Sequence, residues 1–335
     1  MKQPTILDVA ERAGVSKSLV SLVMREPERV SEASRAAVLE AAAELGYRPN
    51  AVARSLVQRR TQVIGVVLSD LHNPFFADVA DGIESAAAAA GYRTMLSSGF
   101  LDPARERSSM ETLLELRVDA LILMGSMMEI RDIEKVAKSL PVALVGRYTD
   151  SDLLDSVGVD DAVGARKAVD YLVGLGHSNI VHIHAGSAAG APRRRAGYEE
   201  AMREHGLDLF IRSVAGDFTE AGGAKAMTEL LQSGDIPTAV FAPNDFSALG
   251  AMDVIDSAGY AIPGDISLFG YDNLTISGLP RISMTTVGQP RTTLGEEAVH
   301  LVLERLNEER NVVRRMVVPP FLVIRSTTGP PPADA

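Results

Sequence analysis

Residues 5–25 read TILDVAERAGVSKSLVSLVMR and contain two short helical patterns separated by a turn with glycine. Thr5, followed by an aspartate three residues later, is typical of a capping box that opens a helix, here over residues 6–13. Ser16 is a favoured N-cap for a second helix, which we expect to reach about Met24. A helix, a short turn with glycine and a second helix together form the helix-turn-helix pattern.

The residues that follow predict a third helix and a small closed domain. Ser31 can cap a helix from Glu32 to Leu45, and Gly46 can end it. A generic three-helix bundle with a solvated lysine and serine face has the same spacing, so the pattern alone leaves both interpretations open. The apolar residues at helical spacing that can close one core are Ile6, Val9, Ala10, Val15, Val20, Val23, Val38, Ala42 and Leu45.

The second helix carries a polar face away from these core positions. In a helix-turn-helix motif this helix enters the major groove, and its N-terminal residues contact base edges. Lys17 and Arg25 can donate to guanine or phosphate, and Ser18 and Ser21 can serve either role. Leu22 on the same face cannot form a hydrogen bond with a base, but it can pack against a thymine methyl group.

Charge is distributed unevenly along the chain. Its 335 residues carry a net charge of −11, which taken alone argues against a nucleic-acid partner. Residues 1–60, however, contain ten basic and seven acidic residues, a net charge of +3, so the rest of the chain carries −14. A basic N-terminal part on an acidic body is expected when only that part touches phosphate, although a chance fluctuation over sixty residues would look the same.

The N-terminal sequence resembles the DNA-binding domain of the lactose-repressor/galactose-repressor (LacI/GalR) family. The matching elements are DVAxxAGVS, the Val20–Ser21 pair, the RVS turn and ELGYxPNxxAxxL, in this order. Leu19 and Leu22 depart from the family, which usually has threonine and arginine there, so the operator bases opposite Leu22 should differ from the family's common half-site. Besides the face of the second helix, the resemblance implies DNA contacts by Thr5, Ser16, Ser31, Asn50, Ala53 and Leu56.

A further short helix is predicted in YRPNAVARSL, residues 47–56. Pro49 sets a boundary and Asn50 is a favoured N-cap, but so short a helix is marginal on its own. In the LacI/GalR family this segment is a hinge that folds into a helix on the operator, where the two hinge helices of a dimer insert leucines into the minor groove. The resemblance therefore implies a hinge helix over residues 50–58 with Leu56 as the inserted side chain, rather than a plain linker.

From residue 61 onward, short apolar runs alternate with amphipathic segments. The runs VIGVVLS, YRTMLS, DALILM, PVALVG, SVGVD, NIVHIHA, TAVFAP, DISLFGYD and SMTTV are typical of short buried strands. This alternation favours an α/β fold with parallel sheets, arranged as two doubly wound lobes with a cleft at the carboxyl ends of the strands. Helices are predicted over residues 76–90, 105–116, 164–175, 194–205 and 246–258.

This part of the chain resembles the effector-binding body of the same family, which is similar to periplasmic sugar-binding proteins. The resemblance rests on NPFF, RVDALIL, AVDYLVGLGH, RRAGY, PNDFSALGAM, IPGDISLFGYD and PPFLVIRSTT. It implies a DNA-binding domain at residues 1–60 and a two-lobed effector-binding domain at residues 61–335. Family topology assigns lobe one to about 61–160 and 290–320, and lobe two to about 161–289 and 321–335.

The matching motifs also imply an effector site between the lobes. Asp272 after FGY matches an acid that hydrogen-bonds the effector, and Arg194 of RRRAGY matches an arginine that binds it. Asn244 of PND matches a polar cleft residue, and Phe218 of GDF matches an aromatic side chain that packs on the ligand ring. The remaining residues of the predicted effector site are Phe75, Phe76 and Asp160.

Each of these residues also has a purely structural interpretation. Asp272 could cap a loop, Arg194 could pair with an acid, and the phenylalanines could be plain core. In a cleft, by contrast, a carboxylate, a guanidinium and an amide can satisfy hydroxyl groups while aromatic rings cover the C–H surface of a ligand. Because Arg193 and Arg195 flank Arg194, a shift of one residue would change that assignment.

Other functional classes lack their signatures. The sequence has no cysteine, which excludes disulfides and thiolate metal sites, and no lysine follows a glycine, which excludes a P-loop. The AGSAAGA sequence does not fit G-x-G-x-x-G, there is no G-x-S-x-G elbow, and His182 and His184 lack a third ligand, so we predict no enzyme, cofactor or metal site. We also expect no signal peptide, which a secreted solute-binding protein would need, and no membrane span.

The sequence thus predicts a cytoplasmic, homodimeric transcriptional regulator, which we expect to be a repressor. Its two DNA-binding domains would bind a pseudo-palindromic operator in double-stranded DNA, and a small effector between the lobes would control binding. A sugar or cyclitol is the favoured effector, because residues 187–191 offer no charged group to the polar edge of a purine. A purine corepressor is the alternative that the aromatic residues leave open, as is the direction of control.

Overall fold

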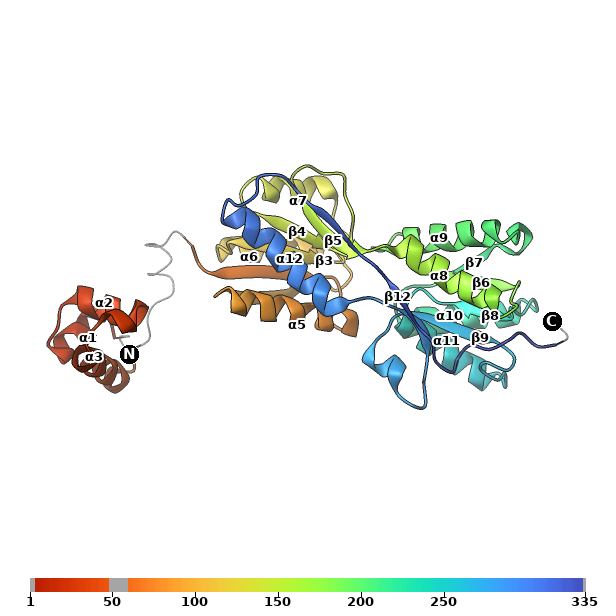
Figure 1. Ribbon diagram of the computed structural model, residues 1–335, viewed down its shortest axis with the longest axis horizontal. Coiled ribbons are helices and arrows are strands. Elements are labelled where there is room, and N and C mark those ends of the chain that lie inside the picture. Colours follow the sequence, from red (N-terminus) through yellow and green to blue (C-terminus); the bar gives the residue numbers. More distant parts are fainter. Residues whose placement is uncertain (1–3, 48–59, 334–335) are drawn as a thin grey trace. The chain divides into compact units, whose positions relative to one another are not determined.

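The computed structural model describes residues 4–47 and 60–333, and the chain divides into two compact units, Met1–Thr61 and Gln62–Ala335 (Figure 1). The first unit is helical, and the second is an α/β body with two lobes. Among the described residues, the helices are all too short or too polar to span a membrane.

The N-terminal unit contains three helices. They are α1 (Ile6–Ala13), α2 (Lys17–Arg25) and α3 (Glu32–Leu45), with a 3-10 turn, η1 (Pro27–Arg29), before α3. Thr5 opens α1 with a complete capping box, because its backbone N–H donates to the Asp8 carboxylate at 2.6 Å and its hydroxyl oxygen accepts from the backbone N–H of Asp8 at 3.5 Å. Gly14 and Gly46 end α1 and α3 at φ of 66° and 64°, so the predicted bounds of these two helices are confirmed.

These helices pack around a small core. Val9, Val20 and Val38 are completely buried, and one comes from each helix. The hydroxyl oxygens of Ser16 and Ser31 each accept a hydrogen bond from the backbone N–H three residues later, at 3.2 and 3.4 Å. Local capping and helical spacing therefore account for the whole domain.

Lobe one of the body is built on a six-stranded parallel sheet with the order β11-β5-β4-β3-β1-β2. Two helices cover one face of the sheet, α5 (Pro74–Ala89) and α12 (Arg291–Leu306), and two cover the other, α6 (Pro103–Glu115) and α7 (Ile130–Ala137). The strands are β1 (Val63–Leu68), β2 (Arg93–Ser98), β3 (Ala120–Met124), β4 (Val142–Val145), β5 (Asp155–Val159) and β11 (Arg315–Val318).

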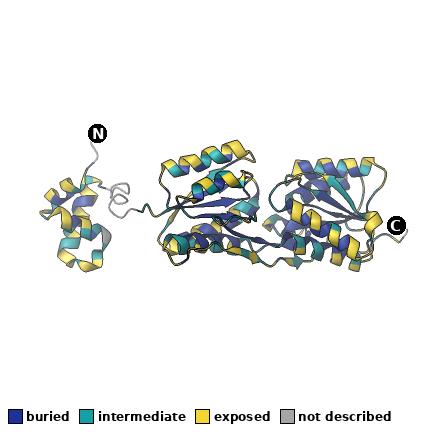
Figure 2. Ribbon diagram, turned by 90° about the horizontal axis from the view of Figure 1, so that it is seen from above, coloured by how far each residue is buried: buried dark blue, intermediate teal, exposed yellow. Residues whose placement is uncertain are grey.

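Lobe two repeats this plan with the order β12-β10-β9-β8-β6-β7. Helices α8 (Asp161–Gly174) and α9 (Ala191–Glu204) cover one face, and α10 (Glu220–Gln232) and α11 (Asp245–Ser257) cover the other. In Figure 2 the strands of both sheets are largely dark blue, and the outward faces of the helices are yellow. The strands are β6 (Ile180–His184), β7 (Arg212–Ala215), β8 (Ala239–Phe241), β9 (Ser267–Asp272), β10 (Thr285–Gly288) and β12 (Phe321–Val323), with 3-10 turns at η2 (Asp208–Phe210) and η3 (Thr275–Gly278).

The chain passes between the lobes three times within residues 60–333. It leaves lobe one after β5, returns from β10 to α12, and runs from β11 of lobe one to β12 of lobe two (Figure 1). Lobe one is therefore assembled from two distant parts of the sequence, because α12 and β11 lie far beyond β5 in the chain.

Two of the helix pairs that cover the sheets pack at backbone distance through a glycine on each helix. A Cβ on Gly82 of α5 would overlap the carbonyl oxygen of Thr292 in α12, and a Cβ on Gly295 would overlap that of Val79 in α5. The α10–α11 pair has the same arrangement at Gly223 and Gly250. Each of these helix pairs is therefore a closely packed unit with no room for a side chain at the crossing.

The structure corrects several details of the predicted body. The sheet of lobe two is not purely parallel, because β12 runs antiparallel to β10. The short strands β7, β11 and β12 were not predicted, and β2, predicted to be buried, is a largely exposed edge strand. The five predicted helices begin one to three residues earlier than expected. In α5 and α6 the reason is that the caps, Asn73 and Asp102, precede a proline at the first helical position.

Candidate functional site

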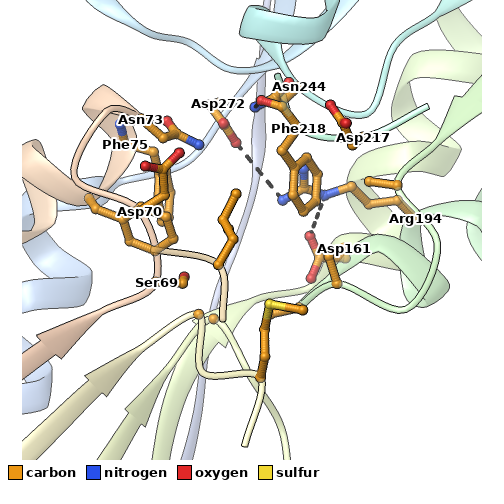
Figure 3. Close-up of a pocket in the computed structure, with 18 of the residues that line it drawn as sticks. Ser69, Asp70, Asn73, Phe75, Asp161, Arg194, Asp217, Phe218, Asn244 and Asp272 are labelled. Atoms are coloured by element: carbon orange, nitrogen blue, oxygen red, sulfur yellow. Dashed lines mark hydrogen bonds and ion pairs between the residues drawn. The ribbon is translucent and has the colours of Figure 1, made fainter. Parts of the chain in front are cut away.

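A cavity of about 300 Å³ lies between the two lobes, at the carboxyl ends of their strands. Lobe one contributes the start of α5, and lobe two contributes residues from α9, from the loop before α10, from the start of α11 and from the end of β9 (Figure 3). The cavity brings together six of the seven residues of the predicted effector site, namely Phe75, Phe76, Arg194, Phe218, Asn244 and Asp272.

Arg194 is held in the wall of the cavity and is only 6% exposed. Its Nε donates to Oδ1 of Asp161 at 2.8 Å and its Nη1 donates to the carbonyl of Pro243 at 2.5 Å. Its Nη2 lies 3.9 Å from Oδ1 of Asp272, and its guanidinium carbon lies 3.7 Å from the centre of the Tyr271 ring. Burial alone would lower the pKa of Arg194. The neighbouring carboxyl groups of Asp161 and Asp272 raise this pKa by more than burial lowers it, so the side chain stays charged.

Asp272 ends β9 in a backbone conformation that is rare for residues other than glycine, with φ of 108°. Two residues that lie where the chain returns from β10 to α12 of lobe one hold Asp272 in this conformation. Gln289 Nε2 donates to Oδ1 of Asp272 at 2.6 Å, and Arg291 donates to the carbonyls of Asp272 and Asn273. A strained residue that its surroundings fix in this way is typical of a functional site.

Arg291 also connects the two lobes. While its Nη1 binds the end of β9 in lobe two, its Nε donates to the carboxylate of Asp78 in α5 at 2.7 Å. The helix α5 begins with residues that line the cavity, including Phe75 and Phe76. One guanidinium therefore joins the backbone of Asp272 to the helix that forms the opposite wall.

Burial raises the pKa of Asp272 to about 7, against the opposing effect of Arg194. The folded state thus keeps this carboxyl protonated to near neutral pH, whereas the unfolded chain ionises it above about pH 4. Between these values the folded state binds one more proton. The stability contributed by this proton is therefore complete below pH 4 and is lost as the pH rises toward 7.

We expect the free energy of unfolding of the ligand-free protein to fall between about pH 4 and pH 7 relative to that of Asp272→Asn. The asparagine keeps an oxygen for Gln289 and does not titrate. The other charged groups around it, Arg194, Asp245 and Arg291, are the same in both proteins. Urea denaturation at several pH values measures the difference, and parallel curves for the two proteins would contradict the raised pKa.

Asn244 positions the start of α11 and the loop before α10 in the wall of the cavity. Its Oδ1 accepts from the backbone N–H of Ser247 at 2.8 Å, which caps α11, and its Nδ2 donates to the carbonyl of Phe218 at 3.1 Å. The Phe218 ring stands in the cavity and lies 5.5 Å from the Arg194 guanidinium (Figure 3). The Asn244 side chain thus uses one polar atom to cap α11 and the other to hold the loop that carries Phe218.

The aromatic wall of lobe one comes from the first turn of α5. Phe75 and Phe76 pack edge to face, with ring centres 5.4 Å apart. Asn73 caps the helix by accepting from the N–H of Phe75 at 3.0 Å, and it also lines the cavity. The sequence NPFF therefore places one amide and two rings at the same edge of the cavity.

The acidic residue of the VDD sequence that lines the cavity is Asp161, and the prediction of Asp160 is corrected by one position. Asp160 is the N-cap of α8, where its Oδ1 accepts from the N–H of Val163 at 3.2 Å. Its carboxylate lies 3.8 Å from Arg193 at the surface, whereas Asp161 is buried against Arg194. The helix begins at Asp161, so the second acid turns inward.

Several other lining residues were not predicted, namely Ser69, Asp70, Asn73, Asp161, Asp217 and Gln289. Asp70 and Asn73 belong to the same strand-to-helix connection as NPFF, so their position after β1 was a usable signal. Gln289 reaches Asp272 only because β10 lies beside β9 in the sheet. Its sequence context gave no such signal.

The structure places the predicted DNA-binding residues of the N-terminal unit on its surface. Lys17, Ser18 and Ser21 are exposed on α2, and Leu22 is half-buried beside them. Thr5, Ser16 and Ser31 are the exposed N-caps of the three helices. The side chain of Arg25 and the predicted hinge with Asn50, Ala53 and Leu56 lie outside the described residues.

His182 takes part in packing. Its Nδ1 donates to the carbonyl of Phe241 at 2.9 Å, and the two rings stack with centres 4.8 Å apart. Burial lowers the pKa of His182 to about 3, so the ring is neutral. In residues 4–47 and 60–333, no group of three or more histidine or acidic side chains is placed to hold a metal ion.

Comparisons with known proteins agree with this arrangement. The family described as periplasmic binding proteins and sugar binding domain of the LacI family matches residues 61–326, and the lacI family of bacterial regulatory proteins matches residues 5–50. The HTH-type transcriptional regulator GalR of Escherichia coli K12 is 35% identical over 334 residues, which is 99% of this chain and 97% of that protein. The HTH-type transcriptional repressor CytR of the same strain is 32% identical over 97% of this chain and 96% of that protein.

A solved structure is similar over nearly the same length. The Lac repressor dimer bound to operator and the anti-inducer ONPF has a TM-score of 0.85 and 29% sequence identity, and the match covers 98% of this chain and 100% of that one. These relatives are transcriptional regulators rather than enzymes. The chain therefore belongs to the LacI family and is a DNA-binding transcriptional regulator.

Proposed function

We propose that this regulator is a cytoplasmic, homodimeric repressor whose affinity for operator DNA is controlled by an effector in the interlobe cavity. The observation that carries the proposal is the cavity itself, where a buried carboxylate–guanidinium network in lobe two faces aromatic rings in lobe one. Two relatives support the repressor and dimer assignments, since one is named a repressor and the other was solved as a dimer on operator.

The proposed DNA contacts start from the exposed face of α2. Lys17, Ser18 and Ser21 would contact phosphates and base edges, and Leu22 would pack against a base rather than hydrogen-bond it. A dimer would present this face twice, so the operator should be pseudo-palindromic. Leu56 of the predicted hinge would insert between base pairs at its centre.

A sugar or cyclitol is the proposed effector. Arg194 and Asp272 would hydrogen-bond its hydroxyl groups, while Phe218 and the two rings of α5 would cover its C–H surface. The description of the body as a sugar binding domain supports this class. The same three aromatic rings keep a purine as the alternative, and calorimetry with both classes of ligand decides between them.

The proposed coupling passes through Arg291. The guanidinium of Arg291 donates hydrogen bonds both to the carbonyl of Asp272 and to the carboxylate of Asp78 in α5. A ligand that contacts Asp272 would therefore act through Arg291 on α5. A change in the angle between the lobes would alter the distance between the two hinges of a dimer, and with it the ability of Leu56 to reach the minor groove.

Selection of bound duplexes from a random pool, at one fixed salt concentration, tests this proposal with the full-length protein. We expect the wild type to enrich a palindrome and Leu56→Ala to enrich it much less, because the alanine cannot unstack a base step. Leu39→Ala is the matched control, because Leu39 is an exposed leucine, 49% accessible, that belongs to α3 and not to α2.

Effector affinity, measured by calorimetry on the same proteins, should be nearly equal in the wild type and Leu56→Ala. Loss of operator affinity alone supports a hinge that acts on DNA. Equal loss of operator and effector affinity would mean that Leu56 stabilises the body instead. Failure of the wild type to enrich any sequence, with or without effector, would contradict the proposed repressor.

A further inference from the structure

The ionisable groups of the cavity are strongly biased toward negative charge. Four aspartic acids line it, Asp70, Asp161, Asp217 and Asp272, of which Asp272 stays protonated to near neutral pH because burial raises its pKa, and Arg194 is the single cation among the described lining residues. Asp70 lies on the lobe-one side, and the other three belong to lobe two (Figure 3). A ligand between the lobes therefore meets acids on both sides.

The one cation is already engaged by the protein. Asp161 accepts from Nε of Arg194 at 2.8 Å, Asp272 lies 3.9 Å from Nη2, and the carbonyl of Pro243 accepts from Nη1. A phosphate or carboxylate on the ligand would have to compete for this guanidinium with the buried carboxylate of Asp161 and the carbonyl of Pro243, which are both hydrogen-bonded to it. Displacing Asp161 would leave its charge buried without a partner, which is costly.

Helix N-termini are the other usual anion sites, and four of those around the cavity already bind a capping side chain of the protein. Asn73, Thr219 and Asn244 line the cavity, and each accepts a hydrogen bond from a backbone N–H of the helix that it caps, α5, α10 and α11 respectively. Asp160 caps α8 in the same way. The N-terminus of α9 has no side-chain cap, but the Asp161 carboxylate lies beside its N-cap residue, Gly190, where an added Cβ would meet it.

We infer that the effector of this regulator is a non-anionic, hydroxyl-bearing molecule and that the cavity rejects sugar phosphates, sugar acids and nucleotides. This inference rests on the proposed function, because it concerns the ligand of the same cavity. The carboxylates accept hydrogen bonds from hydroxyl groups, and the rings cover apolar faces, so a neutral polyol satisfies the wall without any anionic group.

Metabolites from a cell extract, separated by anion exchange, provide the first test. The unretained fraction holds neutral and cationic compounds, and the retained fraction holds anions. Each fraction is added to the full-length protein, and the melting temperature is measured. We expect the unretained fraction alone to raise the melting temperature, by roughly 4 °C if its active compound reaches about 100 times its Kd.

Matched pairs then isolate the effect of charge. The probes are galactose, glucose, ribose and myo-inositol, each beside its monophosphate, and for any pair that binds we expect the phosphate to bind at least about tenfold more weakly. Asp161→Asn tests the cause, because it removes the carboxylate that engages Arg194 and should reduce this discrimination. Its own melting temperature, measured without ligand, shows that the variant is folded.

The two proposals fail in different ways. If the retained fraction raises the melting temperature of the wild type, and Arg194→Ala abolishes the effect, the cavity binds an anion. The inference is then wrong while the proposed effector site stands. If neither fraction has an effect at any concentration, with or without operator DNA, the proposed effector control falls and the inference falls with it.

Discussion

Replacing Arg194 with alanine is expected to abolish effector binding and to destabilise the body by about 3–5 kcal/mol. The side chain is 6% exposed, and it lies between the carboxylates of Asp161 and Asp272. Its removal leaves Asp161 buried without its hydrogen-bonded cation and leaves the carbonyl of Pro243 without its donor. Chemical denaturation gives the stability, and calorimetry with the active ligand gives the binding.

Arg195→Ala is the matched control for this variant. Arg195 is the next residue in α9, but its side chain is 47% exposed and pairs with Glu199 one turn away, at 2.9 Å. An exposed pair of this kind contributes little, so we expect a change within about 0.5 kcal/mol and unaltered effector binding. If both alanine variants were equally stable, Arg194 would not be the cation that compensates the buried acids.

The second large effect is expected at Gly82, where alanine should destabilise lobe one by about 3 kcal/mol. The new Cβ would overlap the carbonyl oxygen of Thr292, so α5 and α12 would have to separate along their contact. Alanine is intrinsically better than glycine in a helix by roughly 1 kcal/mol, so the loss of packing must exceed this gain. Denaturant unfolding of the full-length protein measures the difference.

Gly174→Ala serves as the control, since Gly174 is also helical and an added Cβ there would meet no atom within 4 Å. We expect this variant to be as stable as the wild type or slightly more stable. The same substitution should therefore have opposite consequences at two helical glycines. Equal stability of the Gly82 and Gly174 variants would show that α5 and α12 can separate without cost.

The N-terminal domain could be predicted almost to the residue because its signals are local. Thr5 and its aspartate lie three residues apart, and Gly14 and Gly46 end their helices by backbone conformation alone. The alternation of strands and helices in the body was equally clear. The edge strands β7 and β11 were missed because they are half-exposed and are defined by their pairing partners rather than by an apolar run.

The residues of the cavity show what cannot be predicted from the sequence. Asp160 and Asp161 are the same residue type at adjacent positions, and only the exact start of α8 decides which one faces inward. Gln289 and Arg291 meet Asp272 because β10 lies beside β9 and because the chain then returns to lobe one. Such contacts follow from the assembled sheet, and no spacing in the sequence predicts them.

The two-part construction of lobe one has a consequence for synthesis. The helix α12 and the strand β11 emerge from the ribosome about 130–160 residues after β5, which is roughly 10–30 s at ordinary rates of translation. During this interval the apolar face of β3, β4 and β5 that α12 finally covers has no cover of its own. The DNA-binding domain, by contrast, is complete within the first sixty residues. The growing chain thus carries the whole DNA-binding domain well before lobe one can close, and in that interval the uncovered apolar face of the sheet is prone to aggregation.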